Sequence, residues 1–125
     1  MRTITAQALV VGSGAAGMAA ALRLSQQGVA AAVVTESLCA GTSHNTGSDK
    51  QTYYKLTLSG EGSDSVRAMA RDLMAGGMHG DHAVKEAALS SRAFATLLDL
   101  GVAFPHNPYG EYVGYRTDHD PRQRA

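Results

Sequence analysis

The fold is decided by residues 8–17, which read Ala-Leu-Val-Val-Gly-Ser-Gly-Ala-Ala-Gly. The first four residues are a short apolar run that ends at a glycine, which is typical of a buried strand. A Gly-x-Gly-x-x-Gly turn follows, and an Ala- and Leu-rich stretch to about residue 27 then predicts a helix that Gly28 ends. Residues 30–35 are a second apolar run. We therefore expect residues 1–36 to form one βαβ unit with parallel strands.

The three glycines of the turn have separate expected roles. Gly12 allows a tight exit from the strand, Gly14 lets the backbone approach a diphosphate, and Gly17 lets helix and strand pack closely. The helix that begins here presents unpaired N–H groups and the positive end of its dipole, so phosphates can be bound without a lysine. The residues expected to hold a dinucleotide are Gly12, Ser13, Gly14, Ala15, Ala16 and Gly17.

The end of the second apolar run supplies an acceptor for ribose hydroxyls. Glu36 meets the expectation of an acidic residue about 20 positions beyond the turn. Thr35, one residue earlier, is the alternative, although a hydroxyl binds ribose less firmly than a carboxylate. Glycine-rich turns also occur in unrelated α/β proteins, but the strand, the helix and the acidic residue together favour dinucleotide binding.

Composition limits the other possibilities. A length of 125 residues allows one domain at most. Eleven basic and eleven acidic residues cancel, so we expect no nucleic-acid partner. Cys39 is the only cysteine, and no apolar run approaches the roughly 20 residues of a bilayer-spanning helix. We predict a cytoplasmic protein without a transmembrane segment, with peripheral membrane association through a partner left open.

The remainder of the chain predicts two helices and some short strands. Periodic apolar residues indicate one helix after a cap at Asp64 or Ser65, and another that is capped by Asp81 and ended by Gly101. Short strands are expected at 53–58, 102–104 and 112–115, with a turn at 108–110. The last eight residues carry no helix stop or apolar closing segment. Residues 1–125 are therefore expected to be the N-terminal part of a longer domain.

Histidines raise the possibility of a metal site. His79 and His82 are three residues apart with Asp81 between them. Asp81 is more useful as a helix cap, and nothing in the spacing fixes a third ligand. We predict no metal site.

Three stretches make the chain resemble the flavoprotein family of succinate dehydrogenase, fumarate reductase and L-aspartate oxidase. They are residues 12–36, the segment Thr42-Ser43-His44, which is similar to the family's Arg-Ser-His, and residues 72–104, which end in Leu-Gly-x-x-Phe. The resemblance implies an α/β fold, namely part of a Rossmann-type FAD-binding domain with a parallel sheet flanked by helices. It also implies that Ser43 contacts the flavin side of FAD. For His44 it implies noncovalent contact with the flavin, with a covalent link to the flavin 8α-methyl group as the alternative.

Two departures from the family pattern qualify the resemblance. Where the family has Ala-Gln-Gly-Gly against the flavin ring, this chain has about Ser48-Asp49-Lys50-Gln51. Lys50 could stabilise the anionic reduced ring or could point to solvent. The second departure is residues 117–120, Thr-Asp-His-Asp, whose two carboxylates would oppose binding of a dianionic substrate.

The expected function is that of an FAD-dependent oxidoreductase in which hydride passes between a small organic substrate and flavin N5. In the related enzymes the proton-delivering and substrate-binding groups come from later sequence, so we name no catalytic residue. One alternative is a dinucleotide-binding module that holds FAD or NAD and exchanges electrons with an electron-transfer protein. The other is an inactive fragment without catalysis of its own.

Overall fold

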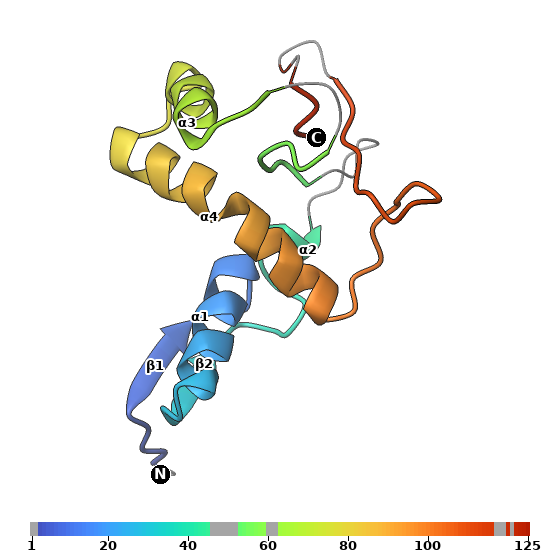
Figure 1. The fold of residues 1–125 in the computed structure, drawn as a ribbon. Coiled ribbons are helices and arrows are strands. Elements are labelled where there is room, and N and C mark those ends of the chain that lie inside the picture. The colour runs from blue at the N-terminus through green and yellow to red at the C-terminus, as the bar shows by residue number, and fades with distance from the viewer. Residues whose placement is uncertain (1–2, 46–52, 60–62, 117–119, 121) are drawn as a thin grey trace. The chain divides into compact units, whose positions relative to one another are not determined.

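The computed structural model describes residues 3–45, 53–59, 63–116, 120 and 122–125 (Figure 1). The chain forms two compact units, Met1–Gln51 and Thr52–Ala125.

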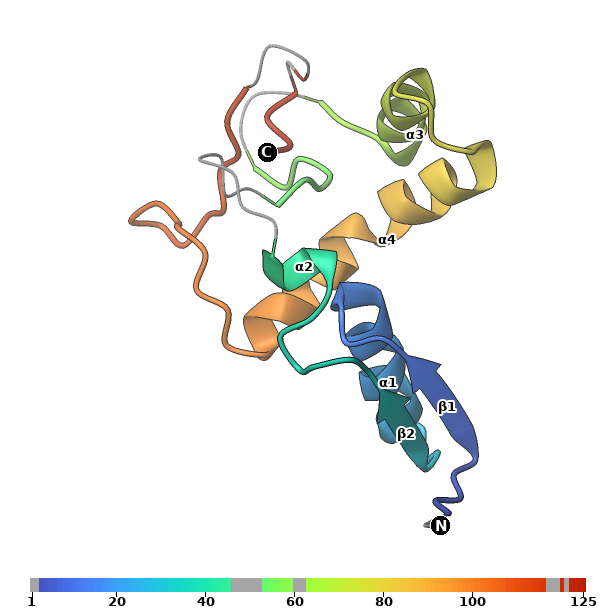
Figure 2. The ribbon, with the colours of Figure 1, turned by 180° about the vertical axis from the view of Figure 1, so that it is seen from behind.

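The first unit is a βαβ structure, as the sequence predicts. Strand β1 (Ala8–Val11) leads through helix α1 (Ala15–Gln26) to strand β2 (Ala31–Val34). The strands are parallel and pair in register from Ala8↔Ala31 to Val11↔Val34. Figure 2 shows the two strands side by side with α1 along one face. The described part of this unit is therefore a partial Rossmann-like α/β fold with a two-stranded sheet.

Only one face of the described sheet is covered. Val10 is buried and contacts the helix side, where its Cγ1 lies 3.5 Å from the position that a Cβ on Gly17 would occupy. Its neighbours Leu9 and Val11 are exposed at 64% and 78%. Successive side chains of a strand point to opposite faces. The prediction of a buried strand therefore holds for the face that α1 covers and not for the other.

The ends of α1 follow the sequence signals. Gly14 is its N-cap residue, with extended backbone at φ −69° and ψ 177°. At the other end Gly28 has φ +74°, a left-handed conformation that side chains disfavour, and its N–H bonds to the Ser25 carbonyl. A short helix, α2 (Thr42–Asn45), follows β2.

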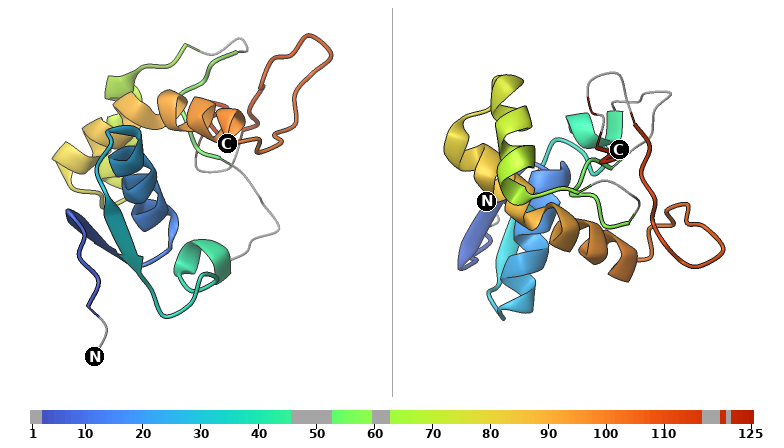
Figure 3. Two further views of the ribbon diagram at one scale, coloured as in Figure 1. Left: turned by 90° about the horizontal axis from the view of Figure 1, so that it is seen from below. Right: turned by 45° about the horizontal axis from the view of Figure 1, so that its top comes forward.

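The second unit is built on helices α3 (Val66–Ala75) and α4 (Gly80–Asp99). Its core contains Met69 and Ala70 of α3 and Ala83 and Ala87 of α4. The two alanines of α4 are four residues apart and lie on one face of the helix, so α3 can pack against the N-terminal half of α4 (Figure 3).

The predicted helix caps are half right. Ser65 caps α3, since its hydroxyl accepts a hydrogen bond from the Ala68 N–H at 3.1 Å. Asp81 does not cap α4, because the helix begins one residue earlier at Gly80 and its N-cap is His79. Asp81 lies instead in the first turn, where a carboxylate is favourable next to the helix dipole.

The strands predicted at 53–58, 102–104 and 112–115 are wrong, because none of these segments forms a strand in the structure. Two of them extend beside residues 122–125, and each shares one backbone–backbone hydrogen bond with that segment. The Lys55 N–H donates to the Arg124 carbonyl at 3.0 Å, and the Tyr115 N–H donates to the Ala125 carbonyl at 3.1 Å. The predicted turn at 108–110 is present in the loop that follows α4 (Figure 2). Gly110 has φ +80°, and its N–H donates to the Asn107 carbonyl at 3.0 Å.

A buried arginine connects residues 122–125 to the rest of the second unit. Arg124 is fully buried and makes a two-pronged contact with Asp64, with Nε 2.8 Å and Nη2 2.7 Å from the carboxylate oxygens. Its Nη1 also donates to Asp72 and to the Tyr54 hydroxyl. Burial would raise the pKa of Asp64, but hydrogen bonds from Arg124, Ser65 and Thr57 outweigh it and lower the pKa to about 2.

Candidate functional site

The glycine turn has the close contacts that its sequence predicts. Gly12 has φ +97°, so it makes the tight exit from β1 that other residues disfavour. A Cβ on Gly17 would overlap the carbonyl of Gly12. The first turn of α1 can therefore lie against the end of β1 only with glycine at position 17, and the expected packing role of this glycine is confirmed.

The first turn of α1 leaves backbone donors available. The cap residue Gly14 has no side chain that could accept a hydrogen bond from the first turn. The first hydrogen bond of the helix is the one from the Met18 N–H to the Gly14 carbonyl. No described residue accepts a hydrogen bond from the N–H groups of Ala16 or Gly17. Exposed amides at the positive end of a helix form a binding site for an anion.

Basic side chains contribute little at this position. Arg23 is the one arginine or lysine among the described residues of Met1–Gln51, and it lies in the last turn of α1. At 1.5 Å per residue it is separated from the helix start by roughly 12 Å. Diphosphate binding here would rely on backbone N–H groups and the helix dipole, which fits the glycine turn.

The two ribose candidates differ in their present contacts. The Thr35 hydroxyl bonds to the Ser13 hydroxyl at 2.9 Å and donates to the Ser37 carbonyl at 3.0 Å. Ser13 and Thr35 thus tie the glycine turn to the chain that leaves β2. Glu36 is exposed, and no described residue contacts its carboxylate. Of the two side chains, Glu36 is the one still available as a ribose acceptor.

The segment around α2 lies directly against the glycine turn. Gly41 has φ +104°, and a Cβ there would lie 3.2 Å from the Gly14 Cα. The Ser43 Oγ accepts a hydrogen bond from the Ala15 N–H at 3.0 Å. The structure therefore brings Ser43 to the start of α1. Its neighbours Thr42 and His44 lie in the same short helix, and Ser43 and His44 are exposed.

Several residues at which the sequence departs from the family pattern fall outside this site. Residues 48–51, including Lys50, and residues 117–119 lie outside the described part of the chain. Asp120 is buried, and its carboxylate accepts hydrogen bonds from the backbone N–H groups of Arg122 and Arg124. The charge of Asp120 is balanced in the Arg124 cluster, and the expectation that the carboxylates of residues 117–120 oppose a dianionic substrate stays a prediction.

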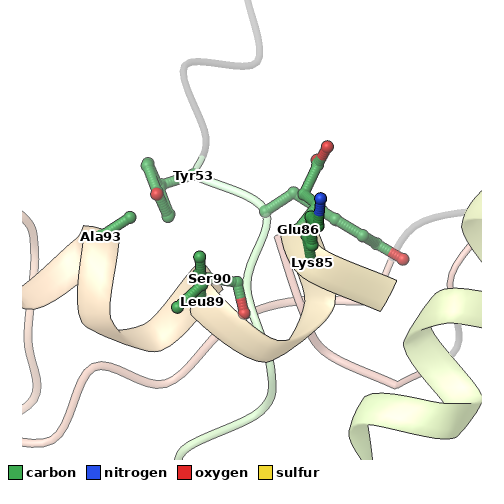
Figure 4. A pocket seen from close by; sticks show the side chains of 7 residues that line it. Tyr53, Lys85, Glu86, Leu89, Ser90 and Ala93 are labelled. Atoms are coloured by element: carbon green, nitrogen blue, oxygen red, sulfur yellow. The ribbon is translucent and has the colours of Figure 1, made fainter. Parts of the chain in front are cut away.

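Other features of the described residues carry no comparable site. The rings of His79 and His82 have centroids 5.6 Å apart, and within the described ranges no group of three or more His, Cys, Asp or Glu residues could hold a metal. None of the described helices combines the length and apolar character needed to cross a membrane. An open hollow of about 460 Å³ lies over α4 (Figure 4). Its lining is Tyr53, Tyr54, Lys85, Glu86, Leu89, Ser90 and Ala93.

Sequence reasoning missed two buried cations in the second unit. Lys55 is 4% exposed, and its Nζ lies 5.0 Å from the centre of the Phe94 ring. Burial lowers the pKa of Lys55. Arg124 is the other, and two of its carboxylate partners, Asp64 and Asp72, are distant in the sequence. No short-range pattern marks either residue, because their burial depends on contacts made by the folded chain.

Comparison with known proteins agrees with this geometry. A family model described as an FAD binding domain matches residues 7–124, which is nearly the whole chain. No curated protein and no solved structure matches it. The match covers the glycine turn, the ribose candidates, the α2 segment and the helical unit together. The chain belongs to the FAD-binding domain family, and its cofactor is FAD.

Proposed function

We propose that the chain holds the diphosphate of FAD at the start of α1. We further propose that it acts as part of an oxidoreductase that transfers hydride between a small organic substrate and flavin N5. The observation that carries this proposal is the glycine turn, where the N–H groups of Ala16 and Gly17 have no acceptor in the part of the chain that the structure describes. The family match supports a flavin-dependent oxidoreductase at the coarser level. When bound, the flavin supplies the redox chemistry, and the protein supplies position and polarity.

The proposed roles of the other residues follow from their places in the first unit. Glu36 accepts hydrogen bonds from the adenosine ribose, because its carboxylate is exposed and Thr35 is already bonded. Ser13 and Thr35 hold the turn in shape. Thr42 and His44 extend the site towards the flavin, as the resemblance implies. Gly12 and Gly17 keep β1 and α1 close enough for the amides to converge.

Gly14 offers a sharp test of the diphosphate site. Its φ is −69°, and a Cβ there would meet nothing nearer than the Ser43 Oγ at 3.6 Å. Alanine at position 14 should therefore fold normally while covering part of the approach to the amides, and the two further methyl groups of valine should cover more of it. We expect the affinity for FAD to fall at least tenfold in Gly14→Ala and further in Gly14→Val, measured by titration of flavin fluorescence.

Gly80→Ala is the matched control, because its Cβ would meet only the flexible end of Met74, at 3.6 Å. It should bind FAD like the unmodified protein. If Gly14→Val folds and retains full affinity for FAD, the diphosphate lies elsewhere and the proposal is wrong.

His44 can be tested by the mass of the denatured protein. We propose noncovalent contact, with the covalent link as the alternative that the resemblance also allows. After loading with FAD and denaturation, noncovalent contact predicts the mass of the polypeptide alone. A mass increased by one FAD that disappears in His44→Ala would establish the covalent link instead.

A further inference from the structure

Two of the hydroxyls that line the hollow over α4 are occupied in holding the fold. The Tyr54 hydroxyl accepts a hydrogen bond from the Arg124 Nη1 at 2.9 Å. The Ser90 hydroxyl accepts from the Leu56 N–H at 3.1 Å and donates to the Ala87 carbonyl at 3.0 Å. These two groups therefore have little capacity left for a ligand.

The other three polar groups of the lining have no partner among the described residues. They are the Tyr53 hydroxyl, the Lys85 ammonium and the Glu86 carboxylate, for which the described part of the chain supplies neither a hydrogen bond nor an ion pair. Lys85 and Glu86 occupy consecutive positions of α4, which do not face each other on a helix. Two opposite charges thus stand side by side and are not neutralised by each other.

The hollow has a charged end and an apolar end. Figure 4 shows Lys85 and Glu86 together at one end, with Tyr53 and Ala93 at the other and Leu89 between them. Four residues separate Lys85 from Leu89, and four more lead to Ala93, so the lining follows one face of α4. From Lys85 to Ala93 the helix rises by roughly 12 Å.

The Tyr53 ring is held in place at the apolar end. Its centroid lies 5.5 Å from that of Phe94 and 6.1 Å from that of Phe104. Burial raises the pKa of the Tyr53 hydroxyl, and the nearby charge of Glu86 raises it further, so the hydroxyl stays an uncharged donor. This wall is formed before a ligand binds, which lowers the entropic cost of binding.

We propose that the hollow binds a free α-amino acid with an apolar side chain. The ammonium of the ligand pairs with Glu86, its carboxylate pairs with Lys85, and its side chain lies against Leu89 and the Tyr53 ring. An amino acid carries both charges next to one carbon, so it matches both protein charges, whereas a ligand with one charge leaves the other unmatched. The volume of about 460 Å³ is in the range of small-molecule sites. All of these residues belong to Thr52–Ala125, so the inference goes beyond the diphosphate site.

Phenylalanine is the probe, and saturation-transfer difference NMR on the full protein detects weak binding of this kind. Because the hollow is open on one side, we expect a Kd of about 1 mM. N-acetylphenylalanine lacks the ammonium, and phenylalaninamide lacks the carboxylate. Each should bind about threefold more weakly than phenylalanine, as for the loss of one exposed ion pair.

Two variants assign the two charges. Glu86→Gln should lower the affinity for phenylalanine about threefold and leave that for N-acetylphenylalanine unchanged. Lys85→Gln should lower the affinity for phenylalanine by a similar factor and leave that for phenylalaninamide unchanged. Asp99→Asn and Arg92→Gln are the matched controls, because each removes an exposed charge of α4 outside the hollow. Neither control should change the affinity for phenylalanine.

Three results would overturn the proposal. The first is the absence of saturation transfer at about 10 mM phenylalanine, well above the expected Kd. The second is equal binding of phenylalanine and N-acetylphenylalaninamide, because the hollow would then recognise an apolar group without its charges. The third is an equal loss of affinity in Glu86→Gln and Asp99→Asn, which would assign the effect to the overall charge of α4.

Discussion

Removing the Arg124 side chain should strongly destabilise the second unit. In Arg124→Leu the Asp64 carboxylate, only 2% exposed, loses both of its guanidinium contacts. A buried charge left without its partner costs about 3–5 kcal/mol. Asp72 is 49% exposed and remains hydrated, so its lost contact adds little. We expect the free energy of unfolding to fall by about 4 kcal/mol.

Urea unfolding followed by circular dichroism measures this change. With a slope of about 2 kcal/mol per M, a loss of that size lowers the midpoint by about 2 M. Arg122→Leu is the matched control: its side chain is 42% exposed and 3.8 Å from Asp72, so it should lower stability by less than about 1 kcal/mol. The double variant Arg124→Leu, Asp64→Leu removes both charges and should be more stable than Arg124→Leu alone. Equal effects of Arg124→Leu and Arg122→Leu would refute the reasoning.

Two further predictions concern the same unit. The pKa of Asp64 is about 2 in the folded protein against an ordinary value of 3.8, so its ionised form is favoured by folding. Its contribution to stability is fully present above pH 3.8 and is lost as the pH falls towards 2. In Asp64→Asn the free energy of unfolding should therefore no longer show this decrease between pH 3.8 and pH 2 in acid unfolding. An unchanged pH dependence would contradict the lowered pKa of Asp64. Ser65→Ala removes the cap of α3 and should lower stability by about 1 kcal/mol, while Ser65→Asp restores it; thermal unfolding decides, and equal melting temperatures for the two variants would count against the cap.

The first unit was predictable because its signals are local. The apolar runs of β1 and β2, the glycine turn and Gly28 each act within a few residues of where they stand. Conformational requirements such as the positive φ of Gly12 are met by one residue type almost regardless of what surrounds it. For the same reason Ser65 was identified as a cap, whereas the cap predicted at Asp81 lies two residues beyond the observed cap, His79.

The extended segments of the second unit were not predictable in this way. Alternation in residues 53–58 and 112–115 predicts strands, but a strand needs a partner and a register that alternation does not specify. In the folded protein both segments bond to residues 122–125. For residues 112–115 this close approach requires glycine at position 114, because a Cβ there would overlap the Gln123 carbonyl. One backbone–backbone hydrogen bond per segment does not form the ladder of a sheet.

The sequence by itself determined the βαβ unit, the glycine turn and the class of cofactor, because short stretches of chain encode backbone conformation and the exposure of amides. Only the tertiary structure decided which side chains meet. Arg124 joins Asp64 across 60 positions, and Ser43 joins Ala15 across 28. Such contacts form between residues that are distant in the sequence and meet only in the folded chain. A buried charge or a bonded hydroxyl has no short-range pattern that reveals its partner.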